Sequence, residues 1–170
     1  MATTDVLVIA DTHAGPSDVD RLLERIGGEL ESADVVLHAG DITDATVLDA
    51  LAARVPNGRV HAVQGNNDRG LALPARLSVE IDGCTVAMVH DSGAADGRRG
   101  RLRKWFPTAD VVVFGHSHLP WHDVDVRDGH VQYHVNPGSP TQRRRAPECT
   151  VAHLLIDDGA VAAIRHVPVG

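Results

Sequence analysis

The stretch DVLVIADTH, residues 5–13, joins an apolar run to a polar end that carries Asp11 and His13. The run is short, rich in Val and apolar on both faces, as expected for a strand that is covered on both sides. Four further runs share this character: DVVLHA at 34–39, RVHAVQ at 59–64, TVAMVH at 85–90 and DVVVF at 110–114. Together these runs predict the central strands of an α/β fold.

Helical patterns lie between the first three strands. One helix, which Ser17 can cap, is predicted by apolar residues that share a face: Val19, Leu22, Leu23, Ile26 and Leu30. A second helix is expected after Thr43, where the apolar residues are Val47, Leu48 and Leu51. The resulting βαβαβ order predicts a largely parallel sheet with right-handed crossovers.

The second half of the chain is rich in hairpin signals. Asp-Gly pairs at 82–83, 128–129 and 158–159 each lie between two strand-like runs. We therefore expect a second sheet that is mostly antiparallel. Residues 98–106, RRGRLRKWF, have the pattern of a basic amphipathic helix.

Length and composition limit the class of protein. A chain of 170 residues with 43% hydrophobic and 23% charged residues is expected to form one globular domain, residues 1–170. No segment approaches the ~20 apolar residues that span a bilayer, and the N-terminus lacks the basic region of a signal peptide. We expect a cytoplasmic protein without membrane contact, in which Cys84 and Cys149 are reduced thiols. The net charge of -7 argues against binding nucleic acid by general electrostatics.

Residue types that bind metals follow each of the five predicted strands. Because the carboxyl ends of strands in an open α/β sheet lie along one edge, these residues are expected to converge. They are Asp11, His13, Asp41, Asn66, His90, His116 and His118. Carboxylate, amide and imidazole ligands together suit Mn²⁺, Fe²⁺, Zn²⁺ or Ni²⁺. Seven ligands are too many for one catalytic ion, so the sequence predicts two ions that share a carboxylate.

Glycines accompany these candidate ligands. Gly40, Gly65 and Gly115 each precede one of them, and a backbone that turns sharply beside a metal leaves no room for a side chain. The stretch GNND at 65–68, taken alone, equally fits a simple turn, because Gly, Asn and Asp tolerate the left-handed backbone. Only its place among the other strand ends favours a metal-binding role.

The motifs DTH, GD, GNND, a strand-terminal His and GHSH, in that order, resemble those of the calcineurin-like metallophosphoesterase superfamily. The length, the early GNxD pattern and NPGS at 136–139 are similar to its small archaeal and bacterial phosphodiesterase branch, to which the retromer subunit of eukaryotes is related. The resemblance covers nearly the whole chain. It implies an α/β fold, a four-layer αββα sandwich of two mixed sheets flanked by helices.

The resemblance also implies a division of the ligands and a reaction. Asp11, His13 and His118 would hold the first ion, Asn66, His90 and His116 the second, and Asp41 would bridge. Two divalent ions, Mn²⁺ first and Ni²⁺, Fe²⁺ or Zn²⁺ as alternatives, would hydrolyse phosphodiesters by a metal-bridging hydroxide. His90 is the least secure ligand, because Asp91 follows it where glycine is commoner in the superfamily.

The sequence departs from the superfamily at Asn67. Many members carry a histidine there, which protonates the leaving oxygen and is oriented by the acid that follows, here Asp68. An amide can donate to a phosphoryl oxygen but is no general acid near neutral pH. Asn67 and Asp68 are therefore candidate catalytic residues, Asn67 and Arg143 are candidate substrate contacts, and activated aryl phosphodiesters are the expected substrates.

The remaining motifs are given structural or surface roles. The NPGS segment is expected to be a turn that supports the metal loop, and His38 a structural residue. His122 and His134 lie near enough to GHSH to line a cleft, whereas no role is given to His61, His130, His153 and His166. The basic clusters at 98–104 and 143–145 are expected on the solvated surface, although the second could reach a substrate phosphate.

Three functions stay open at this point. The first is a dinuclear phosphodiesterase that acts on a small phosphodiester. The second is a non-catalytic binding or scaffold module, which the retromer subunit exemplifies. The third is a nuclease or cyclic-nucleotide phosphodiesterase; nucleic acid is not favoured because of the net charge, and a homo-oligomer is also open. The complete ligand set favours an enzyme.

Overall fold

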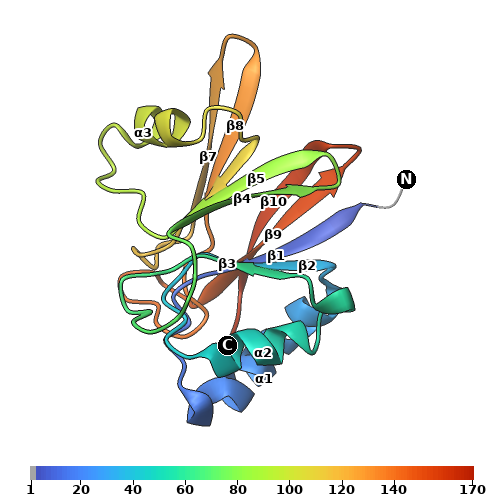
Figure 1. The fold of residues 1–170 in the computed structure, drawn as a ribbon, viewed down its shortest axis with the longest axis vertical. Coiled ribbons are helices and arrows are strands. Elements are labelled where there is room, and N and C mark those ends of the chain that lie inside the picture. Colours follow the sequence, from blue (N-terminus) through green and yellow to red (C-terminus); the bar gives the residue numbers. More distant parts are fainter. Residues whose placement is uncertain (1–2) are drawn as a thin grey trace.

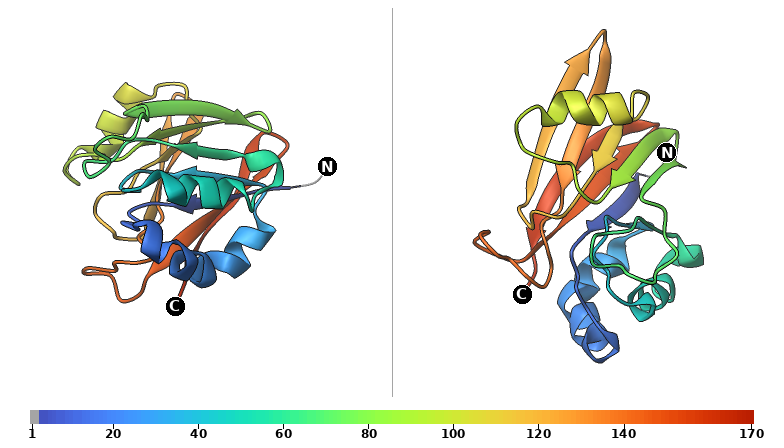
Figure 2. Two further views of the ribbon diagram at one scale, coloured as in Figure 1. Left: turned by 60° about the horizontal axis from the view of Figure 1, so that its bottom comes forward. Right: turned by 60° about the vertical axis from the view of Figure 1, so that its left-hand side comes forward.

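The computed structural model describes residues 3–170 and contains two five-stranded sheets. The first sheet has the order β10-β9-β1-β2-β3 and comprises β1 (Thr4–Ile9), β2 (Val35–His38), β3 (Val60–Ala62), β9 (Thr150–Asp157) and β10 (Ala160–Pro168). The second has the order β4-β5-β6-β8-β7 and comprises β4 (Arg76–Ile81), β5 (Cys84–Val89), β6 (Val111–Val113), β7 (Trp121–Arg127) and β8 (His130–Asn136). The sheets face one another and the helices lie outside them, which confirms the four-layer αββα sandwich (Figures 1 and 2).

The first three strands are parallel neighbours, as the βαβαβ pattern predicts. They are linked by α1 (Val19–Ser32) and by α2 (Ala45–Ala52), which is followed by the 3-10 turn η2 (Pro56–Gly58). Apolar side chains of α1, such as Leu22 and Ile26, pack with Leu7 and Ile9 of β1. The expected cap is wrong by one residue: Ser17 lies inside the 3-10 turn η1 (Pro16–Asp18), and Asp18 occupies the N-cap of α1.

The three Asp-Gly hairpins form where predicted, between β4 and β5, β7 and β8, and β9 and β10. The expectation of a separate, mostly antiparallel second sheet is wrong in detail. The β9–β10 hairpin joins the first sheet, where β9 is antiparallel to β1. In the second sheet, β6 is parallel to both of its neighbours, β5 and β8. Both sheets are therefore mixed.

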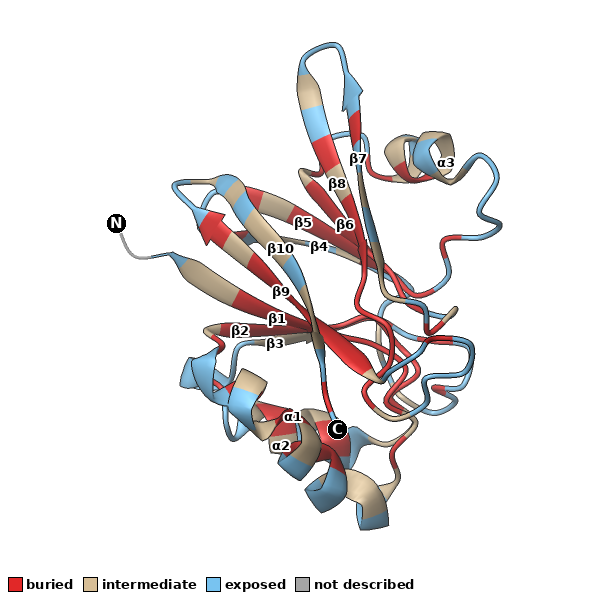
Figure 3. Ribbon diagram, turned by 180° about the vertical axis from the view of Figure 1, so that it is seen from behind, coloured by how far each residue is buried: buried red, intermediate tan, exposed pale blue. Residues whose placement is uncertain are grey.

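The core lies between the two sheets, with a smaller cluster under each helical layer. Val-rich inner faces of both sheets are fully buried, as the red strand segments in Figure 3 show. Helix α3 (Arg98–Trp105) covers the outer face of the second sheet through Leu102, which packs with Val112 and Phe114. Cys84 is buried in the core between the sheets, Cys149 is half-buried, and both are free thiols. Among residues 3–170, no helix is long and apolar enough to cross a membrane.

Backbone hydrogen bonds hold together the loops that leave the parallel strands. The Asp11 N–H donates to the Gly40 carbonyl (2.9 Å), and the His13 N–H donates to the Asp41 carbonyl (3.0 Å). Across the two sheets, the end of β5 is joined to the end of β2 by His90 Nδ1, which donates to the Ala39 carbonyl (2.7 Å). The carboxyl ends of strands from both sheets thus meet at one edge of the sandwich.

Candidate metal centre

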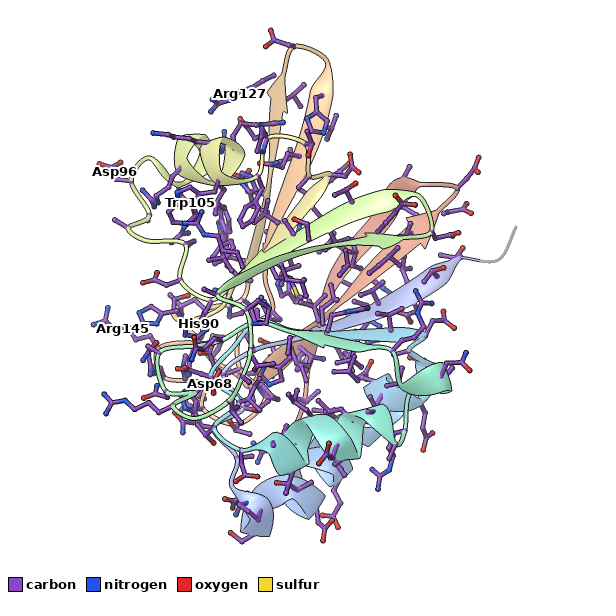
Figure 4. All side chains as sticks on the ribbon, in the orientation of Figure 1. Asp68, His90, Asp96, Trp105, Arg127 and Arg145 are labelled. Atoms are coloured by element: carbon purple, nitrogen blue, oxygen red, sulfur yellow. The ribbon has the colours of Figure 1, made fainter. Side chains whose placement is uncertain are left out.

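All seven predicted ligands meet at this edge. Asp11, His13, Asp41 and Asn66 come from the first sheet, and His90, His116 and His118 from the second. Contacts between their side-chain atoms connect them: His118 Nε2 to Asp11 Oδ1 (3.4 Å), His13 Nε2 to His118 Nε2 (3.4 Å), His90 Nε2 to Asn66 Oδ1 (3.1 Å) and His116 Nδ1 to Asn66 Oδ1 (3.0 Å). Figure 4 shows His90 among the loops of this edge.

Two groups of ligand atoms can be distinguished. Asp11, His13 and His118 form one, and Asp11, Asp41 and His90 form the other; in each group the ligand atoms lie within 4.8 Å of one another. Asp41 Oδ2 lies 3.6 Å from His13 Nε2 and 3.5 Å from His90 Nε2, between the histidines of the two groups. This position suits the shared carboxylate that the sequence predicts. Asp11 also belongs to both groups, which spacing in the sequence does not reveal.

Asp11 is a carboxylate in need of a cation. Its Oδ2 accepts from the His116 N–H (2.9 Å), but its Oδ1 is buried without a hydrogen-bond partner in residues 3–170. Burial, reinforced by the charge of Asp41, raises the pKa of Asp11 to about 8. A buried carboxylate oxygen without a partner is costly, and a bound cation would remove that cost. The donor set therefore fits a metal ion.

The histidines are oriented for coordination. The Nδ1–H of His90 donates to the Ala39 carbonyl (2.7 Å), and the Nδ1–H of His118 donates to the Gln142 carbonyl (2.6 Å). Because a carbonyl only accepts, Nδ1 carries the proton in both rings and Nε2 keeps its lone pair for a metal. Burial lowers the pKa of His13 and of His118, which favours the neutral imidazole that metal binding requires.

The loops leave no space for side chains at the three glycines that precede candidate ligands. A Cβ at Gly40 would lie 2.7 Å from His90 Nδ1 and 2.9 Å from the Gly65 nitrogen. A Cβ at Gly65 would lie 2.2 Å from the Asp41 nitrogen and from its Oδ1. At Gly115 it would lie 2.8 Å from the Ala10 Cβ and 2.9 Å from Asp11 Oδ2. These approaches are closer than atoms tolerate, so the prediction that the backbone beside the ligands leaves no room for a side chain is confirmed.

Asp68 acts on the backbone rather than on residue 67. It is fully buried, and its Oδ1 accepts from the N–H groups of Ile42 and Thr43, both at 2.7 Å. Its Oδ2 accepts from the N–H groups of Asp41 (2.9 Å) and Gly65 (2.7 Å). Asp68 therefore fixes the loop that carries Asp41, and it is a positioning residue rather than a catalytic one.

Asn67 contacts the candidate bridging carboxylate. Its backbone N–H donates to Asp41 Oδ1 (2.9 Å) and its side-chain amide donates to Asp41 Oδ2 (2.8 Å). Burial opposes ionisation of Asp41, but the two bonds from Asn67 and the nearby His90 and His13 lower its pKa overall. The second hydrogen of the amide is still available for a substrate, so the predicted substrate contact of Asn67 stays a prediction.

The NPGS segment supports the metal loops, as predicted. The Asn136 amide donates to the Gly115 carbonyl and to Ser117 Oγ, both at 3.0 Å, and the Ser139 hydroxyl donates to the Asp11 carbonyl (2.8 Å). Thr141 adds a bond that the sequence does not indicate, from its hydroxyl to the Thr12 carbonyl (2.8 Å).

The structure brings a different arginine to the centre from the one expected. Arg143 is exposed, and its guanidinium donates to the Ala146 carbonyl of its own loop (3.1 Å). The next residue, Arg144, donates from its NH1 to the His116 carbonyl (3.3 Å). Three consecutive arginines have the same pattern in the sequence, so only the fold of the loop distinguishes them.

The remaining histidines contact residues other than the ligands. His38 is buried, and its Nε2 lies 2.9 Å from the Thr12 hydroxyl, in line with the predicted structural role. His134 is fully buried with its Nε2 3.0 Å from Gln132 Oε1, and His122 stacks on His166 at a centroid distance of 5.4 Å. The expectation that His122 and His134 line the cleft finds no support in these contacts.

Comparisons with known proteins show the family to which the chain belongs. A model of the calcineurin-like phosphoesterase superfamily domain matches residues 5–159. A probable metallophosphoesterase from Methanocaldococcus jannaschii is 35% identical over 157 residues, 89% of this chain and 75% of the relative. Another, from Methanothermobacter thermautotrophicus, is 33% identical over 141 residues, 81% of this chain and 77% of the relative.

Two solved structures share the fold. The phosphoesterase YfcE from E. coli has a TM-score of 0.58 at 21% identity and covers 98% of this chain and 100% of its own. Vps29 from Entamoeba histolytica, complexed with Zn²⁺, has a TM-score of 0.61 at 21% identity and covers 97% of this chain and 99% of its own. At this identity the likeness concerns the fold alone.

Proposed function

The chain belongs to the calcineurin-like phosphoesterase superfamily, and we propose that it is a phosphodiesterase that depends on two divalent metal ions. One observation carries the proposal: seven competent ligand side chains converge from both sheets, with Asp41 Oδ2 between His13 and His90. The unpartnered, buried Oδ1 of Asp11 supports it, because that atom needs a positive partner.

The side chains divide the work of such a site. When bound, the two cations would lower the pKa of a water molecule and offset the negative charge of the phosphoryl group. Asn67 keeps Asp41 ionised and Asp68 fixes its backbone, so the shared carboxylate is held in place before substrate arrives. The proposal needs no side-chain nucleophile, and Cys84 lies in the core between the sheets.

The substrate class follows from what the site lacks. Position 67 carries an amide, so no general acid stands there to protonate a leaving oxygen, an effect typically worth ~10²- to 10⁴-fold in rate. Small phosphodiesters with activated aryl leaving groups are the proposed substrates. Mn²⁺ is the proposed ion, with Ni²⁺, Fe²⁺ or Zn²⁺ compatible with the same ligands.

The first experiment is hydrolysis of bis(p-nitrophenyl) phosphate beside p-nitrophenyl phosphate. Metal-stripped protein should be inactive, Mn²⁺ should restore hydrolysis of the diester, and Asp41→Asn should abolish it. Asp44→Asn is the matched control, because Asp44 is a half-buried residue outside the ligand set that caps α2 through the Thr46 N–H. Its activity should equal that of the wild type.

The competing function is a binding module without catalysis. Metal binding does not separate the two functions, since a Vps29 of this fold is complexed with Zn²⁺. Hydrolysis does separate them. A folded protein that binds ions but hydrolyses neither ester with any of the four metals would overturn the enzyme and favour the binding module.

A further inference from the structure

Strained backbone is concentrated around the metal centre. Within residues 3–170, eleven non-glycine residues have positive φ, and four of them are Asn or Asp residues followed by glycine in tight turns: Asn57, Asp82, Asp128 and Asp158. The other seven are Asp11, His13, Asp41, Thr43, His116, His118 and Arg144. Five of these are candidate ligands, and Thr43 belongs to the loop held by Asp68. Arg144, with φ of 47°, is the remaining member of the set.

The loop that carries Arg144 is fixed at both ends. On one side, the hydroxyls of Ser139 and Thr141 donate to carbonyls of the loop after β1, and the Gln142 carbonyl accepts from His118 Nδ1. On the other side, the Ala146 N–H donates to the Arg143 carbonyl (2.8 Å), and Ala146 is buried. The left-handed conformation of Arg144 is therefore imposed by its surroundings, as is common at functional sites.

The guanidinium of Arg144 lies beside the metal centre, because its NH1 donates to the backbone carbonyl of the candidate ligand His116 (3.3 Å). Only NH1 is in use, on the His116 carbonyl, and no carboxylate within residues 3–170 forms an ion pair with Arg144. An exposed guanidinium beside a metal centre with spare donors is suited to an anionic oxygen.

We propose that Arg144 binds a non-bridging phosphoryl oxygen of the substrate at the metal centre. The role deepens the proposed function and rests on it. The side chain is anchored through NH1 to the loop that carries His116, and within residues 3–170 its other N–H groups have no hydrogen-bond partner. Because Asn67 carries no positive charge, Arg144 would add a charge of the chain itself to that of the metal ions beside the phosphoryl group.

The test measures binding of inorganic phosphate to the Mn²⁺-loaded protein by calorimetry, so that it does not depend on turnover. Arg144→Gln keeps a donor for the His116 carbonyl but removes the charge, and should weaken phosphate binding about tenfold. Arg145→Gln is the matched control, since Arg145 is exposed at the outer edge of the same loop (Figure 4), and should change binding less than about twofold. Arg144→Gly, which suits the left-handed backbone, should lose as much phosphate affinity as Arg144→Gln while its melting temperature stays near that of the wild type.

The following results would overturn the proposal. Phosphate binding by Arg144→Gln within twofold of the wild type, or an equal loss in Arg145→Gln, would show that the charge at 144 is not specific. Loss of bound Mn²⁺ in Arg144→Gln, measured by elemental analysis, would make the residue structural. If the wild type hydrolyses bis(p-nitrophenyl) phosphate but does not bind phosphate, the role proposed for Arg144 is refuted and the proposed function stands. If the wild type hydrolyses no ester but binds phosphate, and Arg144→Gln loses that binding, only the proposed reaction is refuted.

Discussion

Replacement of Asp68 by asparagine should unfold the loop that carries Asp41. The two carboxylate oxygens accept four backbone N–H groups, two on each oxygen. An asparagine side chain has one oxygen and one NH₂ group, and the NH₂ group cannot accept. In either orientation of the amide, two buried N–H groups therefore lose their acceptor.

The loss can be estimated from these bonds. A hydrogen bond to a charged group contributes about 1.5–3 kcal/mol, so two lost bonds amount to about 3–6 kcal/mol. That is a large share of the ~5–15 kcal/mol by which a domain of this kind is stable. The damage should also reach the metal centre, because one of the four donors is the N–H of Asp41 itself.

Urea unfolding of the metal-free protein, followed by circular dichroism, measures this loss without a contribution from bound ions. Asp44→Asn is again the control, because asparagine caps a helix about as well as aspartate does, and its unfolding midpoint should match the wild type. Asp68→Asn with a free energy of unfolding within about 1 kcal/mol of the wild type would refute the reasoning, since surface substitutions alone span that range.

Three further predictions concern the centre and the core. Mn²⁺ at about 100 times its Kd should stabilise the wild type by about 2.7 kcal/mol. Asp11→Asn removes the buried carboxylate that belongs to both groups of ligand atoms and should abolish this gain in thermal unfolding, whereas an undiminished gain would exclude Asp11 as a ligand. Asn67→His should raise the rate on esters with poor leaving groups more than on nitrophenyl esters, and equal or reduced rates on both would contradict the role given to position 67. Burial and the charge of Asp110 raise the pKa of Cys84 to about 11, so at pH 8 a smaller fraction of Cys84 is thiolate than of an ordinary thiol. Iodoacetamide should therefore modify Cys149 first and Cys84 only on unfolding. Equal labelling of both thiols in the native protein would show that Cys84 is accessible.

Much of the centre can be predicted because strand ends in parallel sheets have a fixed destination. The Val-rich runs that end before Asp11 and Asp41 place both residues at one edge of the first sheet, whereas His90 ends a strand of the second sheet and meets them because the two sheets pack face to face. The sheet that a hairpin joins cannot be predicted in this way, because Asp158-Gly159 indicates a turn but not the strand beside which the hairpin lies. The role of Asp68 could not be predicted from the sequence. Its carboxylate binds four backbone N–H groups, and such bonds leave no trace in the spacing of residues.

The division of the ligands between two sheets has a mechanical consequence. Four of them follow strands of the first sheet and three follow strands of the second, so cations bound as proposed would link the two sheets at this edge of the sandwich. Without the cations, the two sheets are joined at this end by hydrogen bonds between loops, such as those from His90 Nδ1 to the Ala39 carbonyl and from the His116 N–H to Asp11 Oδ2. Metal binding would then slow the separation of the two sheets as well as supply catalytic activity, and both effects would increase together as the ions bind.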